Sequence, residues 1–130
     1  MCELFELWDC DVTYDYDRLN ENTPDSYWTA SRDEGVEFRF NELQELTTIH
    51  LYSDGHSEYS PVDFGSTDIT EFKSIDDVAL HAKTNNLRFE TGELGFLGNH
   101  CTWIKLLHED YSIHYEFREN RLYLVTVSIR

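Results

Sequence analysis

Cysteine is scarce in this chain. Cys2, Cys10 and Cys101 are the only cysteines among 130 residues, and no two of them form a Cys-x-x-Cys pair. A disulfide framework uses an even number of cysteines, and structural zinc sites use closely spaced ligands. The odd count therefore indicates free thiols in a reducing compartment. A chain of this length buries about two-thirds of its unfolded surface, so we expect a core that is stable without disulfides or metals.

Long apolar stretches are also lacking. The amino terminus has no basic region followed by an apolar run, so no secretory signal peptide is predicted. No window reaches the roughly 18 apolar residues that a membrane-spanning helix needs. We therefore expect a cytoplasmic protein that does not bind a membrane.

Positive charge is the third deficit. The chain has 10 basic and 26 acidic side chains, which gives a net charge of −16. The first 37 residues alone carry 11 acids against Arg18 and Arg32, a net charge of −9. Such a field repels nucleic acid and anionic membranes and attracts basic proteins. The competing interpretation is an acidic surface that serves solubility only.

Motifs for catalysis are absent as well. The sequence contains no Gly-x-Ser-x-Gly, P-loop or Gly-x-Gly-x-x-Gly pattern, and its histidines show neither His-x-His nor His-x-x-x-His spacing. The histidines are His50, His56, His81, His100, His108 and His114. We therefore predict no catalytic residues, no metal and no cofactor. A small hydrolase that uses histidine and carboxylates stays as an alternative, because so many acids always supply carboxylate pairs.

The clearest structural signal is at the carboxyl end. Apolar residues alternate with polar ones over 111–117 and again over 123–129, the period of a half-buried strand. A three-residue turn at 119–121 would place Phe117 opposite Tyr123 and Tyr115 opposite Val125, so that apolar residues pair throughout. We prefer that register to the one set by a two-residue turn. A turn at 109–110 would add a third strand to this meander.

Earlier segments predict a hairpin and a helix. Residues 36–40 and 43–52 read as two strands, whereas 18–34, 57–69 and the glycine-containing stretch 92–98 read as connections. Ser74 begins a predicted helix over 75–85, whose inward face is Ile75, Val78, Ala79 and Ala82. Residues 87–90 are a further candidate strand. The expected fold is α+β in a single domain (1–130): an antiparallel sheet, made of a hairpin plus the C-terminal meander, with one or two helices on one face.

An acidic row stands out near the amino terminus. Asp9, Asp11, Asp15 and Asp17 lie at even spacings, so a strand over 9–17 would carry them on one face. An edge strand protected by its charges and an extended loop are the alternatives. Aromatic residues in the acidic segments either pack onto the core or act as binding anchors. The candidate partner-binding residues are Asp9, Asp11, Asp15, Asp17, Asp25, Tyr27, Trp28, Asp54, His56, Glu58, Tyr59 and Asp63.

One part of the chain resembles a known group of proteins. The run DEGVEFRF at 33–40, followed by LQELT at 43–47 and the strand at 49–52, resembles immunity proteins encoded beside bacterial polymorphic toxins, including contact-dependent growth inhibition systems. The order of elements is similar from about residue 33 to the end, and residues 1–32 match nothing in that group. The resemblance implies an antitoxin that binds and neutralises a cognate toxin domain.

Charge and resemblance lead to the same hypothesis. Many delivered toxins are nucleases with basic clefts, so an acidic inhibitor that takes the place of backbone phosphates is expected to bind one quickly. The rival binding hypothesis is a generic acidic adaptor with another basic partner. A pocket with a perturbed histidine beside Cys101 or a carboxylate would favour the enzyme. An exposed acidic patch with aromatic residues and no cavity would favour the inhibitor.

Overall fold

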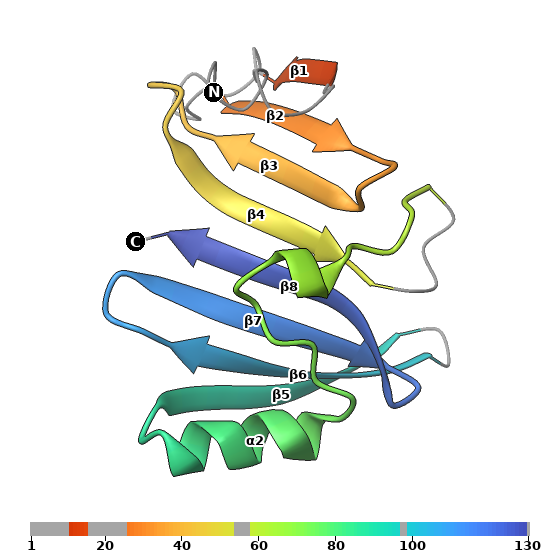
Figure 1. Ribbon diagram of the computed structural model, residues 1–130, viewed down its shortest axis with the longest axis vertical. Coiled ribbons are helices and arrows are strands. Elements are labelled where there is room, and N and C mark those ends of the chain that lie inside the picture. The colour runs from red at the N-terminus through yellow and green to blue at the C-terminus, as the bar shows by residue number, and fades with distance from the viewer. Residues whose placement is uncertain (1–10, 16–25, 54–57, 97–98, 130) are drawn as a thin grey trace.

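The computed structural model describes residues 11–15, 26–53, 58–96 and 99–129 (Figure 1). These residues form eight strands, one short 3-10 helix (η1, Phe64–Ser66) and one α-helix (α2, Ile75–Thr84). The strands are β1 (Asp11–Asp15), β2 (Ser26–Ser31), β3 (Val36–Phe40), β4 (Leu46–Tyr52), β5 (Arg88–Phe96), β6 (Asn99–Leu107), β7 (Tyr111–Arg118) and β8 (Arg121–Ile129).

All eight described strands belong to one antiparallel sheet in the order β1-β2-β3-β4-β8-β7-β6-β5. Strands β1 to β4 form one meander, β5 to β8 form a second, and the two join where β4 pairs with β8. After β4 the chain crosses one face of the sheet through η1 and α2 and begins the second meander at the far edge (Figure 1). The predicted α+β architecture is confirmed, although the expected first hairpin is part of a four-stranded meander.

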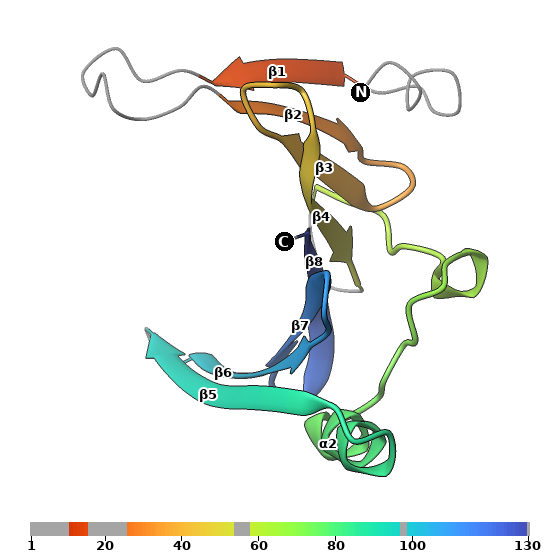
Figure 2. The same ribbon diagram turned by 90° about the vertical axis from the view of Figure 1, so that its left-hand side faces the viewer.

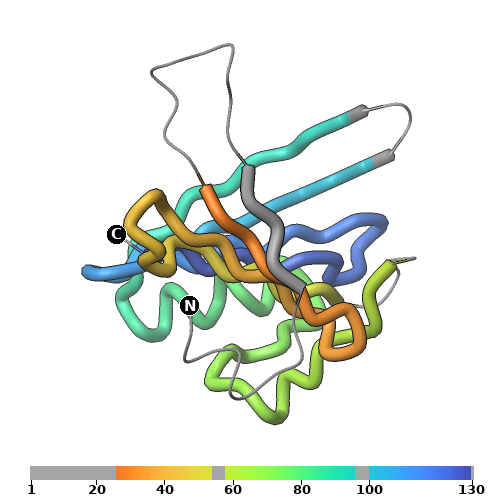
Figure 3. Tube along the Cα trace, turned by 90° about the horizontal axis from the view of Figure 1, so that it is seen from above, coloured from red at the N-terminus to blue at the C-terminus, as the bar shows by residue number. Residues whose placement is uncertain are grey.

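Both helices lie on the same side of the sheet (Figure 2). Viewed along the stack of strands, β5 and β6 run steeply across the direction of β2 and β3 (Figure 3). Neighbouring strands in a sheet are rotated by roughly 20–25° on average, and this rotation accumulates over many strands. A short helix that packs along one end of such a sheet does not cover the other end.

The predicted register of the last hairpin is confirmed over most of its length. Tyr111 pairs with Ile129, and Tyr115 pairs with Val125. The prediction is wrong at the turn end, where Phe117 pairs with Leu122 rather than Tyr123. Glu119 and Asn120 both have positive φ (50° and 63°), as a two-residue hairpin turn requires.

A β-bulge allows the hairpin to have this short turn and still keep the predicted register in its other half. The pairing register shifts between Glu116 and Phe117, so Tyr123 is the extra residue on β8. Phe117 and Leu122 are both buried, at 1% and 8% exposure. The bulge therefore gives the turn its favoured length while an apolar pair stays in the core. The other predicted turn, at 109–110, is confirmed, because Ile104 pairs with Tyr115 and Leu106 with Ile113.

Two predicted connections are strands instead. Residues 26–31 were expected to be polar connection, but they form β2 between β1 and β3, with Thr29 fully buried opposite Phe38. Gly92 and Gly95 were expected in a loop, but both lie within β5. A Cβ atom at Gly92 would stand 2.5 Å from the indole of Trp103, so glycine makes room for this ring on the paired strand.

The helix predicted over 75–85 is confirmed as α2, Ile75–Thr84, with Asn85 as its C-cap. Ser74 is the N-cap, and its hydroxyl accepts a hydrogen bond from the Asp77 backbone N–H at 3.3 Å. At the other end Asn86 has a φ of 55°, and the Leu87 N–H donates to the Ala82 carbonyl, which is a Schellman-type ending. Val78 and Ala82 are fully buried against the sheet, as predicted.

This helix covers only part of its side of the sheet. Ten residues make a helix about 15 Å long, whereas eight strands about 4.8 Å apart span roughly 34 Å. α2 packs on β5 and β6. Over β4 and β8, the same side carries the segment around η1 (Figure 1). We therefore expect the part of the hydrophobic core that α2 does not cover to lie beside η1.

Candidate protein-binding site

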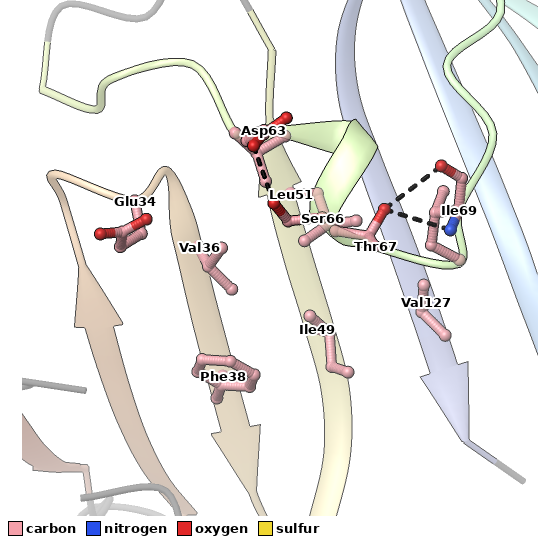
Figure 4. Close-up of a pocket in the computed structure, with 11 residues that line it drawn as sticks. Glu34, Val36, Phe38, Ile49, Leu51, Asp63, Ser66, Thr67, Ile69 and Val127 are labelled. Carbon is pink, nitrogen blue, oxygen red and sulfur yellow. Dashed lines mark hydrogen bonds between the residues drawn. The ribbon is translucent and has the colours of Figure 1, made fainter. Parts of the chain in front are cut away.

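An apolar groove of about 340 Å³ lies between the sheet and the segment around η1 (Figure 4). Its lining residues are Glu34, Val36, Phe38, Ile49, Leu51, Val62, Asp63, Ser66, Thr67, Ile69 and Val127. Val36, Phe38 and Leu51 are buried at 3–7% exposure and belong to the core. Ile49, Ile69 and Val127 are half-buried and pack against it. The groove is thus an open edge of the hydrophobic core.

A glycine turn holds one end of the groove. Gly35 has a φ of 71°, and a Cβ there would overlap the Ser60 carbonyl oxygen, so only glycine fits. The Ser60 N–H donates to the Arg32 carbonyl at 2.9 Å, and the Val62 N–H donates to the Tyr52 carbonyl at 2.8 Å. These bonds fasten the segment that leads into η1 to the turn between β2 and β3 and to the end of β4.

Local hydrogen bonds shape the η1 side. Asp63 caps η1: its carboxylate accepts from the Gly65 N–H at 3.1 Å and from the Ser66 hydroxyl at 2.7 Å. Thr67 closes the segment, because its hydroxyl donates to the Phe64 carbonyl and accepts from the Ile69 N–H. Phe64 is buried under this turn at 8% exposure. The groove wall is therefore a fixed turn anchored in the core.

The polar rim of the groove is acidic. Glu34 and Asp63 are exposed, and none of the described lining residues is basic. The crossing segment 58–77 carries six acids and one base, Lys73. The acids are Glu58, Asp63, Asp68, Glu71, Asp76 and Asp77, all of them exposed. An apolar depression with a negative border follows from this arrangement.

A second polar cluster surrounds the buried carboxylate of Glu37 on β3. Its Oε2 accepts from the Tyr52 hydroxyl at 2.9 Å and from the Tyr59 hydroxyl at 3.3 Å, and the two rings stack at 3.9 Å. Arg39 Nη2 lies 3.0 Å from Oε1, although no aligned hydrogen bond reaches that oxygen from the described atoms. At this distance the contact is an ion pair. The side chain of Arg39 is 48% exposed, so its side of the pair lies at the surface.

Nearby ionisable groups are shifted mainly by burial. Burial raises the pKa of Tyr52, and the hydrogen bond to Glu37 raises it further. Burial lowers the pKa of His50 and of His114, while the carboxylates of Glu37 and Glu116 partly oppose this. Both imidazoles are therefore neutral near pH 7. His50 Nδ1 lies 3.2 Å from the Thr126 hydroxyl oxygen.

The features of an active site do not converge in the described part of the chain. His50 does lie near Glu37, but neither residue lines the groove. Burial raises the pKa of the Cys101 thiol, with a further rise from Glu116, which disfavours the reactive thiolate. Among the described residues no group of histidine, cysteine and carboxylate side chains is placed to hold a metal ion.

Some predicted partner-binding residues lie outside the described residues, namely Asp9, Asp17, Asp25, Asp54 and His56. Asp11 and Asp15 belong to β1, which confirms a strand there and places it at the edge of the sheet. Tyr27 is half-buried and packs against the core cluster. Trp28 is half-buried and pairs with Arg39 in the neighbouring strand.

The remaining three are on or near the crossing segment. Glu58 is exposed, Tyr59 stacks on Tyr52, and Asp63 stands at the rim of the groove. The structure therefore brings together Tyr59 with the Glu37 cluster and Asp63 with the groove. Tyr27 and Trp28 lie on β2 and do not line the groove.

Sequence reasoning missed the groove itself. Its apolar residues on β3, β4 and β8 were recognised as strand positions, whereas Val62 and Ile69 were assigned to a connection. A strand pattern does not say whether another element covers its apolar face. One signal was available: a single helix of about ten residues is too short to cover a sheet of this many strands. An acidic patch without a cavity was to favour the inhibitor, and a pocket with a perturbed histidine was to favour the enzyme. The structure meets neither criterion, because it has a cavity and that cavity is lined by no histidine.

Comparisons of this chain with protein-family models, curated proteins and solved structures find no match. No helix within the described ranges has both the length and the apolar character needed to cross a membrane.

Proposed function

We propose that this chain is a cytoplasmic immunity protein of a bacterial polymorphic-toxin or contact-dependent growth inhibition system. In this role it binds a cognate basic toxin domain, a nuclease, and neutralises it without catalysis or a cofactor. The observation that carries the proposal is the exposed acidic crossing segment, 58–77, beside an open apolar groove, in a chain with a net charge of −16. The resemblance at 33–52 supports the same class.

Acidic side chains suit this role for a physical reason. A nuclease must attract phosphates, so its cleft presents lysine and arginine to any negative surface. Alternate residues on a strand are about 6.6–6.8 Å apart, so the predicted acidic face at Asp9, Asp11, Asp15 and Asp17 would offer negative groups at multiples of this spacing. Long-range electrostatic attraction raises the rate at which the chain and the toxin domain associate. An antitoxin needs this speed, because it must bind the toxin before the toxin acts.

The proposal predicts that a toxin domain is encoded immediately upstream of this chain, and the test uses that domain. Purified chain is titrated into that domain while nuclease activity and association rate are measured at low and high salt. We expect stoichiometric loss of activity and association that slows as salt shortens the Debye length from about 10 Å at 0.1 M to about 3 Å at 1 M. A toxin domain that stays fully active with excess chain would contradict the proposal.

Matched variants locate the surface. One variant changes Asp9, Asp11, Asp15 and Asp17 to asparagine. A second changes four acids of the crossing segment to their amides, at Glu58, Asp63, Asp68 and Glu71. The control removes the same number of charges elsewhere, at Glu90, Glu93, Glu109 and Asp110, which are exposed on β5 and the β6–β7 turn. A variant that alters the contact surface should lose much more affinity for the toxin domain than the control variant. Equal losses of affinity in all three variants would indicate an effect of net charge.

A generic adaptor for another basic protein is the competing function. It predicts binding to a basic partner with no effect on the toxin's activity. The activity assay separates the two, because neutralisation is required of an immunity protein and not of an adaptor.

A further inference from the structure

We infer that the groove between η1 and the sheet receives one apolar side chain of the partner, with lysine or arginine on either side of it in the partner's sequence. This inference rests on the proposed function, because it gives the chemistry of the partner segment that the acidic surface recognises. The occupant is a protein segment, and its inserted side chain is aromatic or large and aliphatic.

The volume and the apolar lining of the groove suit a single side chain of a partner protein. A volume of about 340 Å³ lies at the lower end of the roughly 300–1,000 Å³ of small-molecule pockets, so it suits one large side chain. The floor is the apolar face of three adjacent strands, contributed by Val36, Leu51 and Val127 among others. Aromatic side chains that fill such desolvated pockets dominate the energy of protein interfaces.

The acidic rim of the groove selects the residues that flank this side chain in the partner's sequence. Glu34 and Asp63 border the groove from two separate elements, the β2–β3 turn and the cap of η1 (Figure 4). Asp63 is held in place by its two hydrogen bonds to the η1 backbone and Ser66, so its position is set before any partner arrives. An acidic partner segment would be repelled here, and a neutral one would leave the attraction unused.

The apolar surface continues beyond the groove along β8. Ile129, two residues after Val127 and therefore on the same face of the strand, is 45% exposed. Its register partner on β7, Tyr111, is 38% exposed. The groove lies on the same side of the sheet as α2, over the part of that side that α2 does not cover. A partner segment therefore has apolar surface to follow after its anchor residue is seated.

The test uses short capped peptides, so it does not depend on identifying the toxin. Isotope-labelled full chain is titrated with Lys-Trp-Lys, and methyl resonances of Ile49, Ile69 and Val127 are followed by NMR. Glu-Trp-Glu and Lys-Ala-Lys are the controls for charge and for the anchor. We expect saturable shifts with Lys-Trp-Lys only, and binding weaker by roughly 2- to 5-fold for each of Glu34→Gln and Asp63→Asn.

Two protein variants complete the design. Val127→Arg fills the groove and should abolish the shifts, with Leu94→Arg as control, since Leu94 is 59% exposed on β5. If Val127→Arg is unfolded by circular dichroism, the Glu34→Gln and Asp63→Asn pair decides, because both are exposed isosteric changes. No shifts at millimolar Lys-Trp-Lys, or equal shifts with Glu-Trp-Glu, would overturn the inference.

Other occupants give distinct results that also overturn it. If the wild type dimerises by sedimentation and Val127→Arg is monomeric, the groove is a contact between two copies. If Phe5→Ser with Trp8→Ser shifts the same methyl resonances without peptide, the chain's own amino-terminal segment fills the groove. Toxin that is neutralised equally well by wild type and Val127→Arg refutes the groove while leaving the proposed function standing. Toxin that is never neutralised refutes the function, whatever the peptides show.

Discussion

At the scale of single residues, Glu37 is the one charged residue that is buried in the described part of the chain. Its side chain is only 8% exposed, yet it accepts two tyrosine hydroxyls and lies beside Arg39. A buried charge is tolerated when hydrogen bonds and an opposite charge replace its water. Glu37 therefore ties β3, β4 and the segment after β4 together, next to the groove wall.

Replacing Tyr52 with phenylalanine tests this arrangement. The change removes a 2.9 Å hydrogen bond to a buried carboxylate without changing the ring. We expect the free energy of unfolding to fall by about 1.5–3 kcal/mol, measured by urea denaturation. Tyr59→Phe is the graded comparison, with a smaller loss because its bond is longer at 3.3 Å. A loss below about 0.5 kcal/mol for Tyr52→Phe would show that water replaces the hydroxyl.

The two buried imidazoles predict a pH dependence. Burial lowers the pKa of His50 and His114 below the ordinary value of 6.5, so the unfolded chain binds protons more readily than the folded chain. The stability they contribute is fully present above about pH 6.5 and is lost as the pH falls towards the folded pKa values. Denaturation at several pH values between about 7.5 and 5 measures this loss.

The control for the pH effect removes the titrating groups. His50→Gln with His114→Gln should flatten that part of the profile, and His100→Gln, at an exposed position, is the matched control substitution. Identical profiles for wild type and the double variant would contradict the assignment.

At the scale of elements, the capped helix and the bulged hairpin show how local chemistry sets boundaries. Helix α2 begins where Ser74 accepts the Asp77 N–H and ends where Asn86 takes a positive φ. The β7–β8 hairpin keeps a two-residue turn because a bulge absorbs one residue. In both cases residues of the turn or cap determine where the regular element stops.

Ser74→Ala should lower the free energy of unfolding by about 1 kcal/mol, because the Asp77 N–H at the start of α2 loses its partner. Ser74→Asp is the matched control, since aspartate also caps and its charge suits the positive end of the helix dipole. Chemical denaturation with circular dichroism measures both. Equal stability of the alanine and aspartate variants would mean that the cap is not needed.

At the scale of the whole molecule, charge and coverage are the two unusual properties. A net charge of −16 acts against the compact state through self-repulsion. One helix over one end of an eight-stranded sheet leaves half-buried apolar residues such as Val127 beside an open groove. Both properties cost stability, and both are properties that a partner of opposite charge with an apolar anchor would relieve.

Salt should stabilise the free protein. Raising the ionic strength from about 0.01 M to about 1 M shortens the Debye length from roughly 30 Å to 3 Å and screens repulsion among the excess acids. We expect the melting temperature to rise with sodium chloride, measured by calorimetry. The rise should be smaller for the variant with asparagine at positions 9, 11, 15 and 17, because it carries four fewer negative charges. A fall in melting temperature with salt would show that attractive pairs dominate.

By itself, the sequence determined the local features of this protein. Strict alternation determined the faces of β7 and β8 and most of their register, and Ser74 and the asparagine pair at 85–86 determined the ends of α2. These signals depend on neighbours a few residues apart, which backbone geometry places together wherever the segment lies. Net charge is likewise a property of composition alone.

Only the tertiary structure decided what lies beside what. Residues 26–31 were assigned to a connection because turn residues precede them, although Tyr27, Trp28 and Thr29 favour strands; pairing with β1 and β3 made this stretch β2. The pairing of β4 with β8 across more than 70 residues put Ile49 and Val127 side by side, and the crossing segment carried α2 past them to the far edge. The groove exists because of that route, and no short-range pattern encodes it, since the contacts that form it join residues far apart in the chain.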